Sequence, residues 1–178
     1  MNVINFRFLF LMLFLVSLGA PKLSAQLRVL SATGTIASFN EPTSGIDQTL
    51  IGGTFSIEYP IKSITLRGDV TYAKSNSDDS SAPPTIDRFV GYRGYLGYII
   101  GNGNRIQFPV LIGLGLFGTD GDIVYERIGF SGHAGLRYYI SSLLAVEGNV
   151  KYDLLQDSDD QSPGIFQLNI GLVYSYGL

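Results

Sequence analysis

The strongest constraint on the fold of this chain is an alternation of apolar and polar residues at every second position, which recurs from about residue 27 onward. In the clearest segment, six uncharged residues share one face: Leu144, Val146, Gly148, Val150, Tyr152 and Leu154. Three of the five residues between them are charged, namely Glu147, Lys151 and Asp153. Because successive side chains of a strand point to opposite faces, this pattern predicts a β-strand with one apolar and one polar face.

The same alternation predicts eight strands, at residues 27–39, 48–60, 64–72, 89–100, 105–118, 127–138, 144–154 and 166–178. The second and fifth fit more loosely, and the first is ambiguous in phase, as a strand with a β-bulge would be. Most have roughly 11 to 14 residues. That is longer than most strands of globular proteins and long enough for a tilted strand to cross a bilayer.

The connections between these segments alternate in character. After odd-numbered strands they are polar and acidic, at residues 40–47, 75–87, 119–122 and 156–163. After even-numbered strands they are tight, at residues 60–61, 101–104 and 141–142. An antiparallel barrel with short turns at one end and longer loops at the other would have this asymmetry.

The amino-terminal segment predicts export. Arg7 precedes an apolar run at residues 8–16, and a segment that contains several small residues follows and ends at Ala25. We therefore predict a cleaved signal peptide at residues 1–25 and a barrel domain at residues 26–178. No later segment has the 18 or so uninterrupted apolar residues of a membrane helix. The chain has no cysteine, which excludes a disulfide scaffold, and its net charge of −3 gives no reason to expect nucleic acid as a partner.

Taken together, the alternation, the Tyr-rich apolar face, the rhythm of short turns and long loops, and a last strand that runs to the carboxyl terminus resemble one family. It is the small eight-stranded outer-membrane β-barrels of Gram-negative bacteria, of the OmpA/OmpX type. The resemblance implies an all-β fold, a closed antiparallel up-and-down transmembrane β-barrel of eight strands in the cell outer membrane. It also implies periplasmic termini and external acidic loops.

Partners follow from the same resemblance. We expect contacts with outer-membrane lipid and lipopolysaccharide, a last strand that the barrel-assembly machinery recognises, and a monomer. The terminal strand of that family usually ends in an aromatic residue. Here the chain ends in Leu178, with Tyr174 and Tyr176 before it on the same face, so the aliphatic end departs from the commonest form.

A soluble exported barrel, with its apolar face inward, is the main rival structure. Two features disfavour it. The polar face holds many glycines, which suit a narrow interior better than a solvated surface: Gly91, Gly97, Gly129, Gly135 and Gly171. Tyrosines cluster near the predicted strand ends, where they would form interfacial girdles: Tyr59, Tyr72, Tyr92, Tyr98, Tyr138, Tyr152, Tyr174 and Tyr176.

If the polar face lines the lumen, ionisable side chains fill it: Glu58, Arg67, Asp69, Arg93, Arg127, His133, Arg137, Glu147, Lys151 and Asp153. An eight-stranded barrel has an interior just wide enough for side chains. Extending the alternation across the turn at Ser142 predicts that Arg137 faces Glu147, His133 faces Lys151 and Ser131 faces Asp153. The sequence therefore predicts an ion-paired, plugged lumen and not an open pore.

These features favour a structural or surface-interaction (adhesion-like) role. The alternatives are a small-solute porin-like channel and a soluble periplasmic ligand-binding barrel. An outer-membrane lipid hydrolase is disfavoured, because Ser131, His133 and Asp153 have the residue types of a catalytic triad but point into the lumen, away from lipid. We expect no catalytic role, no cofactor and no metal.

Three acidic clusters in the predicted loops could bind a surface ligand or a cation. They are Asp78 with Asp79, Asp120 with Asp122, and Asp157 with Asp159 and Asp160. None completes the ligand spacing of an EF-hand. Solvated loop charge is therefore the simplest interpretation.

Overall fold

The computed structural model describes residues 28–41, 46–61, 64–75, 86–101, 104–121, 126–156 and 164–176. These form eight strands: β1 (Arg28–Glu41), β2 (Ile46–Ile61), β3 (Ile64–Lys74), β4 (Ile86–Ile100), β5 (Ile106–Gly121), β6 (Glu126–Tyr139), β7 (Leu144–Leu155) and β8 (Gly164–Tyr176). The predicted signal peptide, Leu178 and most of the acidic loop residues (Asp78, Asp79, Asp122, Asp157, Asp159 and Asp160) lie outside the described residues. Within the described segments, no helix is long and apolar enough to cross a membrane.

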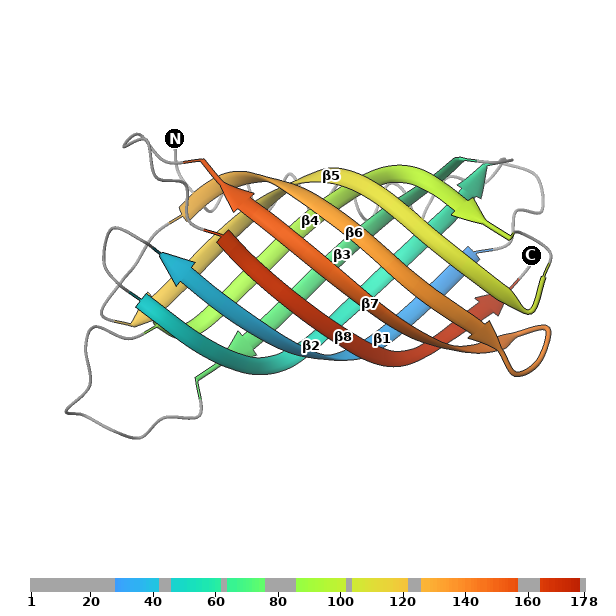
Figure 1. The fold of residues 1–178 in the computed structure, drawn as a ribbon, viewed down its shortest axis with the longest axis horizontal. Helices are drawn as coiled ribbons and strands as arrows, with labels where there is room; N and C mark the ends of the chain where they lie inside the picture. Colours follow the sequence, from blue (N-terminus) through green and yellow to red (C-terminus); the bar gives the residue numbers. More distant parts are fainter. Residues whose placement is uncertain are drawn as a thin grey trace.

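The strands close into a barrel in chain order (Figure 1). Each strand pairs antiparallel with its neighbours in the sequence, and β1 pairs antiparallel with β8. β1, β3, β5 and β7 end at the left of Figure 1, which we call the loop end, and the other four end at the right, the turn end. The predicted closed up-and-down barrel is confirmed.

The register of the pairs fixes the tilt of the strands. A path through paired residues that leaves β1 at Val29 passes through Glu58, Arg67 and Tyr95, crosses β5 to β8, and returns to β1 at Phe39. The offset of ten residues around eight strands corresponds to a tilt of about 40°. At that tilt even the shortest strand, β3 with 11 residues, rises about 28 Å, close to the thickness of a bilayer's apolar core.

The strands extend further at the loop end than the sequence pattern indicates. β1 continues to Glu41 and β5 continues to Gly121, so parts of the predicted loops at residues 40–47 and 119–122 are strand. The prediction of a β-bulge in the first strand is wrong, because β1 pairs with both neighbouring strands without a register shift. Its phase was ambiguous because small residues such as Ala32 and Thr33 lie on both faces. The irregularity lies instead between Ile86 and Arg88 of β4.

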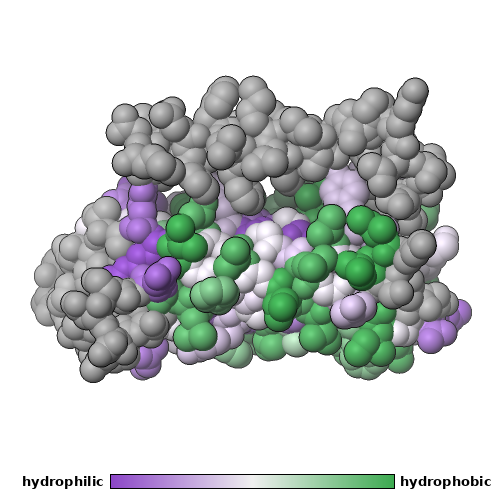
Figure 2. Space-filling view, turned by 90° about the horizontal axis from the view of Figure 1, so that it is seen from above, coloured by the Kyte–Doolittle hydropathy of each residue, from purple (hydrophilic) through white to green (hydrophobic). Residues whose placement is uncertain are grey.

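The exterior of the barrel is apolar. Large hydrophobic residues point outward from all eight strands, with exposed fractions as high as 73% for Ile112 and 68% for Ile170. Figure 2 shows many hydrophobic residues along the visible wall, and hydrophilic residues at its left end and, in a smaller group, at its right end. This arrangement confirms the predicted alternation, with the apolar face outward.

Apolar side chains cluster inside the barrel at both ends. A cluster at the loop end contains Phe39, Phe89 and Phe117 together with Ala37, Leu50, Ala73, Ile86, Leu155 and Ile165. Phe89 stacks on Phe117 with ring centroids 6.2 Å apart, and Phe39 meets Phe89 edge-on at 5.7 Å. A smaller cluster at the turn end contains Val29, Ala145 and Val173, with Tyr139 packed against it. The polar part of the lumen therefore lies between two apolar caps.

Candidate functional site

The candidate site is the polar band of the lumen. Nine of the ten ionisable residues predicted for the lumen are buried: Glu58, Arg67, Asp69, Arg93, His133, Arg137, Glu147, Lys151 and Asp153. The tenth, Arg127, is half-buried near the loop end of β6. The buried set among the described residues thus holds four basic and four acidic side chains besides His133, so its formal charges balance when the histidine is neutral.

Glu147 on β7 is the centre of the larger charge cluster. Its Oε2 accepts hydrogen bonds from Arg137 Nε at 2.9 Å and from Arg137 Nη2 at 2.6 Å. Its Oε1 accepts one from Arg67 Nη1 at 2.9 Å. Arg137 also donates both terminal nitrogens to the carboxylate of Glu58, at 3.1 and 3.0 Å. Two guanidinium groups therefore link carboxylates from opposite walls of the barrel, in the forked geometry that suits arginine.

The cluster continues to Asp69 on β3. Arg67 Nε donates to Asp69 Oδ1 at 2.8 Å, and the ammonium of Lys151 contacts the other carboxylate oxygen. Arg67 Nη2 also donates to the hydroxyl of Ser56 at 2.9 Å. These partners are all buried, and such desolvated ions are stable only when each is paired and hydrogen-bonded.

A second charge pair joins Arg93 on β4 to Asp153 on β7. Arg93 donates from Nε at 2.9 Å and from Nη2 at 2.6 Å to the two carboxylate oxygens. Ser131 and Gln167 also donate to that carboxylate, at 2.6 and 2.8 Å. The guanidinium of Arg93 lies 4.9 Å from the ring centroid of Phe117, which joins the polar band to the apolar cap at the loop end.

A series of hydrogen-bonded hydroxyl groups begins at Arg93 and leads to Asn169. Asn169 Oδ1 can only accept, so Thr35 donates its single hydroxyl proton to it at 2.6 Å. Thr54 has two acceptors in reach, Thr35 at 2.8 Å and Asn169 Oδ1 at 3.4 Å, and the shorter contact assigns its proton to Thr35. Thr71 then donates to Thr54 at 2.8 Å. Arg93 Nη1 donates to Thr71 at 2.8 Å. Every hydroxyl proton in the series is thereby assigned.

The series ends at the other charge cluster. Asn169 Nδ2 donates to Asn149 Oδ1 at 2.9 Å, and Asn149 Nδ2 donates to Glu147 Oε1 at 2.9 Å. We call Thr71, Thr54, Thr35, Asn169 and Asn149 the lumen hydrogen-bond chain. All its donors point the same way, from the cation Arg93 to the anion Glu147, an arrangement in which each bond polarises the next.

The three cross-strand pairs predicted from the turn at Ser142 are present between β6 and β7. Arg137 pairs with Glu147, His133 with Lys151, and Ser131 with Asp153. The last pair does not form the hydrogen-bond order of a catalytic triad, because Ser131 donates directly to Asp153. Among the described residues, neither ring nitrogen of His133 has a hydrogen-bond partner.

The roles of the uncharged polar residues and of the apolar caps were not predicted from the sequence. The threonines and asparagines of the lumen hydrogen-bond chain share the inward phase of the charged residues, which is the signal that could have indicated them. Phe39, Phe89 and Phe117 also point inward, against the rule that large apolar residues face lipid. In the part of the chain that the structure describes, no three His, Asp or Glu side chains are arranged to hold a metal ion.

The predicted interfacial tyrosines all have the outward phase, and they fall into two groups. Tyr59, Tyr98, Tyr138, Tyr174 and Tyr176 lie toward the turn end, and Tyr72, Tyr92 and Tyr152 toward the loop end. Five of the eight are close to half exposed, and Tyr59, Tyr92 and Tyr176 are less exposed. Two aromatic groups with an apolar wall between them are typical of a barrel that spans a membrane.

Comparison with known families agrees with this geometry. The model of the outer membrane protein beta-barrel domain matches residues 8–175. The chain belongs to this family. Members and structural neighbours are outer-membrane barrels, which gives the chain an outer-membrane location.

Several solved outer-membrane barrels have the same fold. Neisserial surface protein A aligns with a TM-score of 0.66 and 14% identity, over 84% of this chain and 97% of that one. The attachment invasion locus protein Ail of Yersinia pestis aligns with a TM-score of 0.63 and 14% identity, over 85% and 99%. The amino-terminal barrel domain of Pseudomonas aeruginosa OprF aligns with a TM-score of 0.53 and 14% identity, over 83% and 97%. Comparison with curated protein sequences gives no match.

Proposed function

We propose that this outer-membrane barrel has a sealed, ion-paired lumen and serves a structural or surface-interaction role without conducting solutes. The observation that supports this is the filling of the interior. Four arginine and lysine side chains are buried against four carboxylates in its middle, and an apolar cluster lies at each end. A diffusion pore needs a continuous wet path, and a lumen filled by paired side chains leaves none.

Conductance across a planar bilayer tests the sealed lumen. The barrel, purified from outer membranes and inserted into the bilayer, should give no large steady current. The conductance of the unmodified barrel is compared with that of the variant Glu147→Gln, in which Arg67 and Arg137 lose their shared carboxylate. A large, steady conductance of the unmodified barrel would refute the proposal and favour the porin-like channel.

The surface role belongs to the loop end. The acidic residues Asp78 and Asp157 follow strands that end there, and Asp120 lies in the last residues of β5 at the same end. Loops on a rigid scaffold are the usual place for binding, and the attachment role named for Ail makes adhesion the first activity to test. Cells that display the barrel should adhere to a host-cell layer more than cells in which residues 76–85 are replaced by a Gly-Ser segment of equal length. Equal adherence at equal surface amounts would contradict this role.

Lipid, lipopolysaccharide and the barrel-assembly machinery are the proposed partners of a monomeric barrel. The last strand, β8, presents outward Tyr174 and Tyr176, whose rings stack at 6.2 Å. Replacing both with Ser should reduce the amount of heat-modifiable barrel in outer membranes, that is, of folded barrel whose band on a detergent gel shifts only after heating. Replacing Tyr98, which lies at the same end on another strand, should reduce this amount less. Equal losses would argue against a special role for β8.

A further inference from the structure

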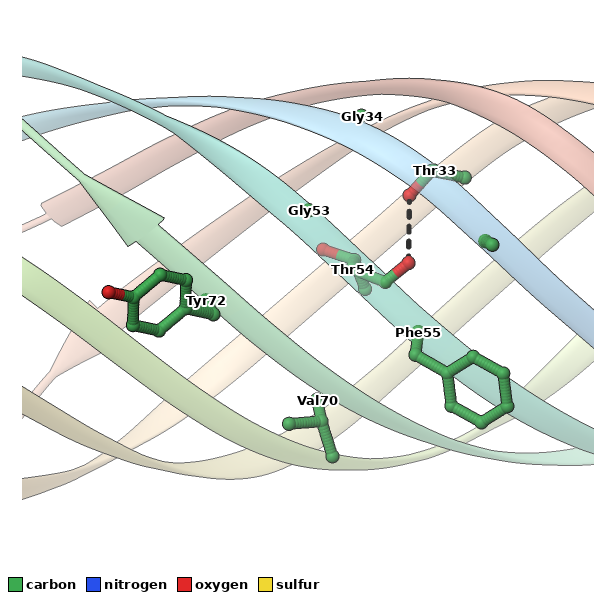
Figure 3. Close-up of a pocket in the computed structure, with 8 residues that line it drawn as sticks. Thr33, Gly34, Gly53, Thr54, Phe55, Val70 and Tyr72 are labelled. Atoms are coloured by element: carbon green, nitrogen blue, oxygen red, sulfur yellow. Dashed lines mark hydrogen bonds between the residues drawn. The ribbon is translucent and has the colours of Figure 1, made fainter. Parts of the chain in front are cut away.

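A shallow groove lies on the outward face of β1, β2 and β3 (Figure 3). Gly34 and Gly53 are paired across β1 and β2 and form its floor. A Cβ atom on Gly34 would approach no other atom closer than 3.8 Å, and one on Gly53 none closer than 3.4 Å. The groove therefore exists because two neighbouring side chains are missing from an otherwise bulky wall.

Large apolar side chains flank this floor. Phe55 and Tyr72 lie on either side of Gly53 in Figure 3, and Val70 adds to the wall below them. Phe55 is 47% exposed and Tyr72 is 49% exposed, so both rings stand out from the barrel. The groove lies within the part of the wall that contacts membrane lipid.

Two basic residues lie one row beyond the groove, toward the loop end. Lys74 follows Tyr72 on the same face of β3, and it is paired across the strands with Arg88 of β4. Like charges directly opposite each other destabilise a sheet. Arg88 forms an exposed ion pair with Asp120, whereas Lys74 forms none with any residue that the structure describes. The row Lys74, Arg88 and Asp120 keeps one net positive charge at the rim.

We propose that this surface binds one phosphate-bearing lipid of the surrounding leaflet. One acyl chain lies over Gly34 and Gly53 between Phe55 and Tyr72, and the phosphate contacts Lys74 and Arg88. An adjacent apolar groove and basic rim match the two ends of such a molecule. The site deepens the lipid partnership proposed above, on which it rests, by giving it residues and a chemical class.

The size of the groove favours a lipid over a second copy of the barrel. Eight residues line the groove, whereas a stable protein interface takes about 20 to 30 residues from each side. Gly34 and Gly53 lie on neighbouring strands roughly 5 Å apart, so the open space above them is narrow and suits an extended acyl chain better than a protein surface. Each basic side chain near the membrane surface raises the affinity for an anionic headgroup by about a factor of five.

Native mass spectrometry of the barrel, expressed in outer membranes and extracted in mild detergent, tests the site. The probes are phosphatidylglycerol, diphosphoryl lipid A and diacylglycerol, each titrated into the detergent, together with inorganic phosphate as competitor. We expect one molecule of a phosphate-bearing lipid to bind to each barrel, and diacylglycerol to bind about tenfold more weakly. Millimolar inorganic phosphate should displace neither phosphatidylglycerol nor lipid A. The two lipids distinguish a glycerophospholipid from a lipid A source of the same phosphate.

Two variants and their matched controls locate the binding. Gly34→Val fills the groove, and Lys74→Gln with Arg88→Gln removes the charges; each should weaken binding about tenfold. Gly132→Val adds the same side chain at another open outward position, and Arg105→Gln removes an exposed charge at the opposite end, so neither should change it. Heat-modifiable migration of each variant establishes that it is folded.

If Gly34→Val and Gly132→Val bind lipid equally well, the lipid does not lie in the groove and the proposal is overturned. If diacylglycerol and phosphatidylglycerol bind equally well, the proposed phosphate contact is overturned. Displacement of lipid by inorganic phosphate would mean that only a free anion site exists, which also overturns the proposal. A conducting barrel that still binds lipid would refute the sealed lumen alone. A sealed barrel that binds no lipid would refute the lipid site alone.

Discussion

The substitution Glu147→Gln is the most direct test of the ion-paired lumen. The carboxylate accepts four hydrogen bonds: two from Arg137 at 2.9 and 2.6 Å, one from Arg67 at 2.9 Å and one from Asn149 at 2.9 Å. A glutamine has nearly the same shape but only one accepting oxygen. In either orientation of its amide, the new NH₂ group faces donors, so two of the four bonds are lost. The buried set also changes from balanced to net positive.

The magnitude follows from these contacts. Each hydrogen bond to a charged group contributes about 1.5 to 3 kcal/mol, so the loss of two gives about 3 to 6 kcal/mol. Breaking a buried ion pair from one side costs about 3 to 5 kcal/mol, in agreement. We expect the free energy of unfolding to fall by about 4 kcal/mol.

Urea unfolding in lipid vesicles, followed by the heat-modifiable band on gels, measures this loss. Asp120→Asn is the matched control, because it makes the same chemical change in the exposed pair with Arg88 and should cost at most about 1 kcal/mol. If Glu147→Gln destabilises the barrel no more than Asp120→Asn does, the lumen is hydrated and the reasoning is wrong.

Three further predictions use the same unfolding assay or a simple folding gel. Thr54→Val interrupts the lumen hydrogen-bond chain and should cost about 1 to 3 kcal/mol, whereas Thr49→Val at an exposed position should change stability by less than about 0.5 kcal/mol. Gly171→Ala should abolish the folded band, because its Cβ would lie 2.1 Å from a backbone oxygen, whereas Gly148→Ala has open space and should fold. Phe117→Ala removes a ring of the cap at the loop end and should cost about 3 to 5 kcal/mol; a loss below about 1 kcal/mol would mean that the cap is loosely packed.

Local alternation was sufficient to predict which residues face the lumen. The inward phase of Arg93, Arg137 and Glu147 follows from their parity along each strand, and the pairs across the short turn between β6 and β7 follow from its length. The contact of Arg93 with Asp153 was not predicted, because it crosses the barrel between β4 and β7. Such a contact depends on the barrel radius and on the ten-residue offset, and neither is contained in a local pattern.

The apolar caps show a second limit of the alternation rule. Phe89 and Phe117 occupy inward positions of strands whose other inward residues are mostly polar or small, so parity alone gives no reason for a phenylalanine there. The reason lies in the neighbours from other strands, Phe39 above all, which meet only in the closed barrel. The groove at Gly34 and Gly53 has the same origin, since its two glycines come from different strands.

The lumen hydrogen-bond chain also has a consequence for assembly. Thr35 belongs to the first strand and Asn169 to the last, and 134 positions of sequence separate them. The link between them can form only when β1 meets β8. Until that moment the lumen hydrogen-bond chain is interrupted, because the hydroxyl of Thr35 and the amide oxygen of Asn169 lack each other as partners. An unclosed sheet is therefore penalised in its interior as well as at its edges, so closure of the barrel should be abrupt and cooperative.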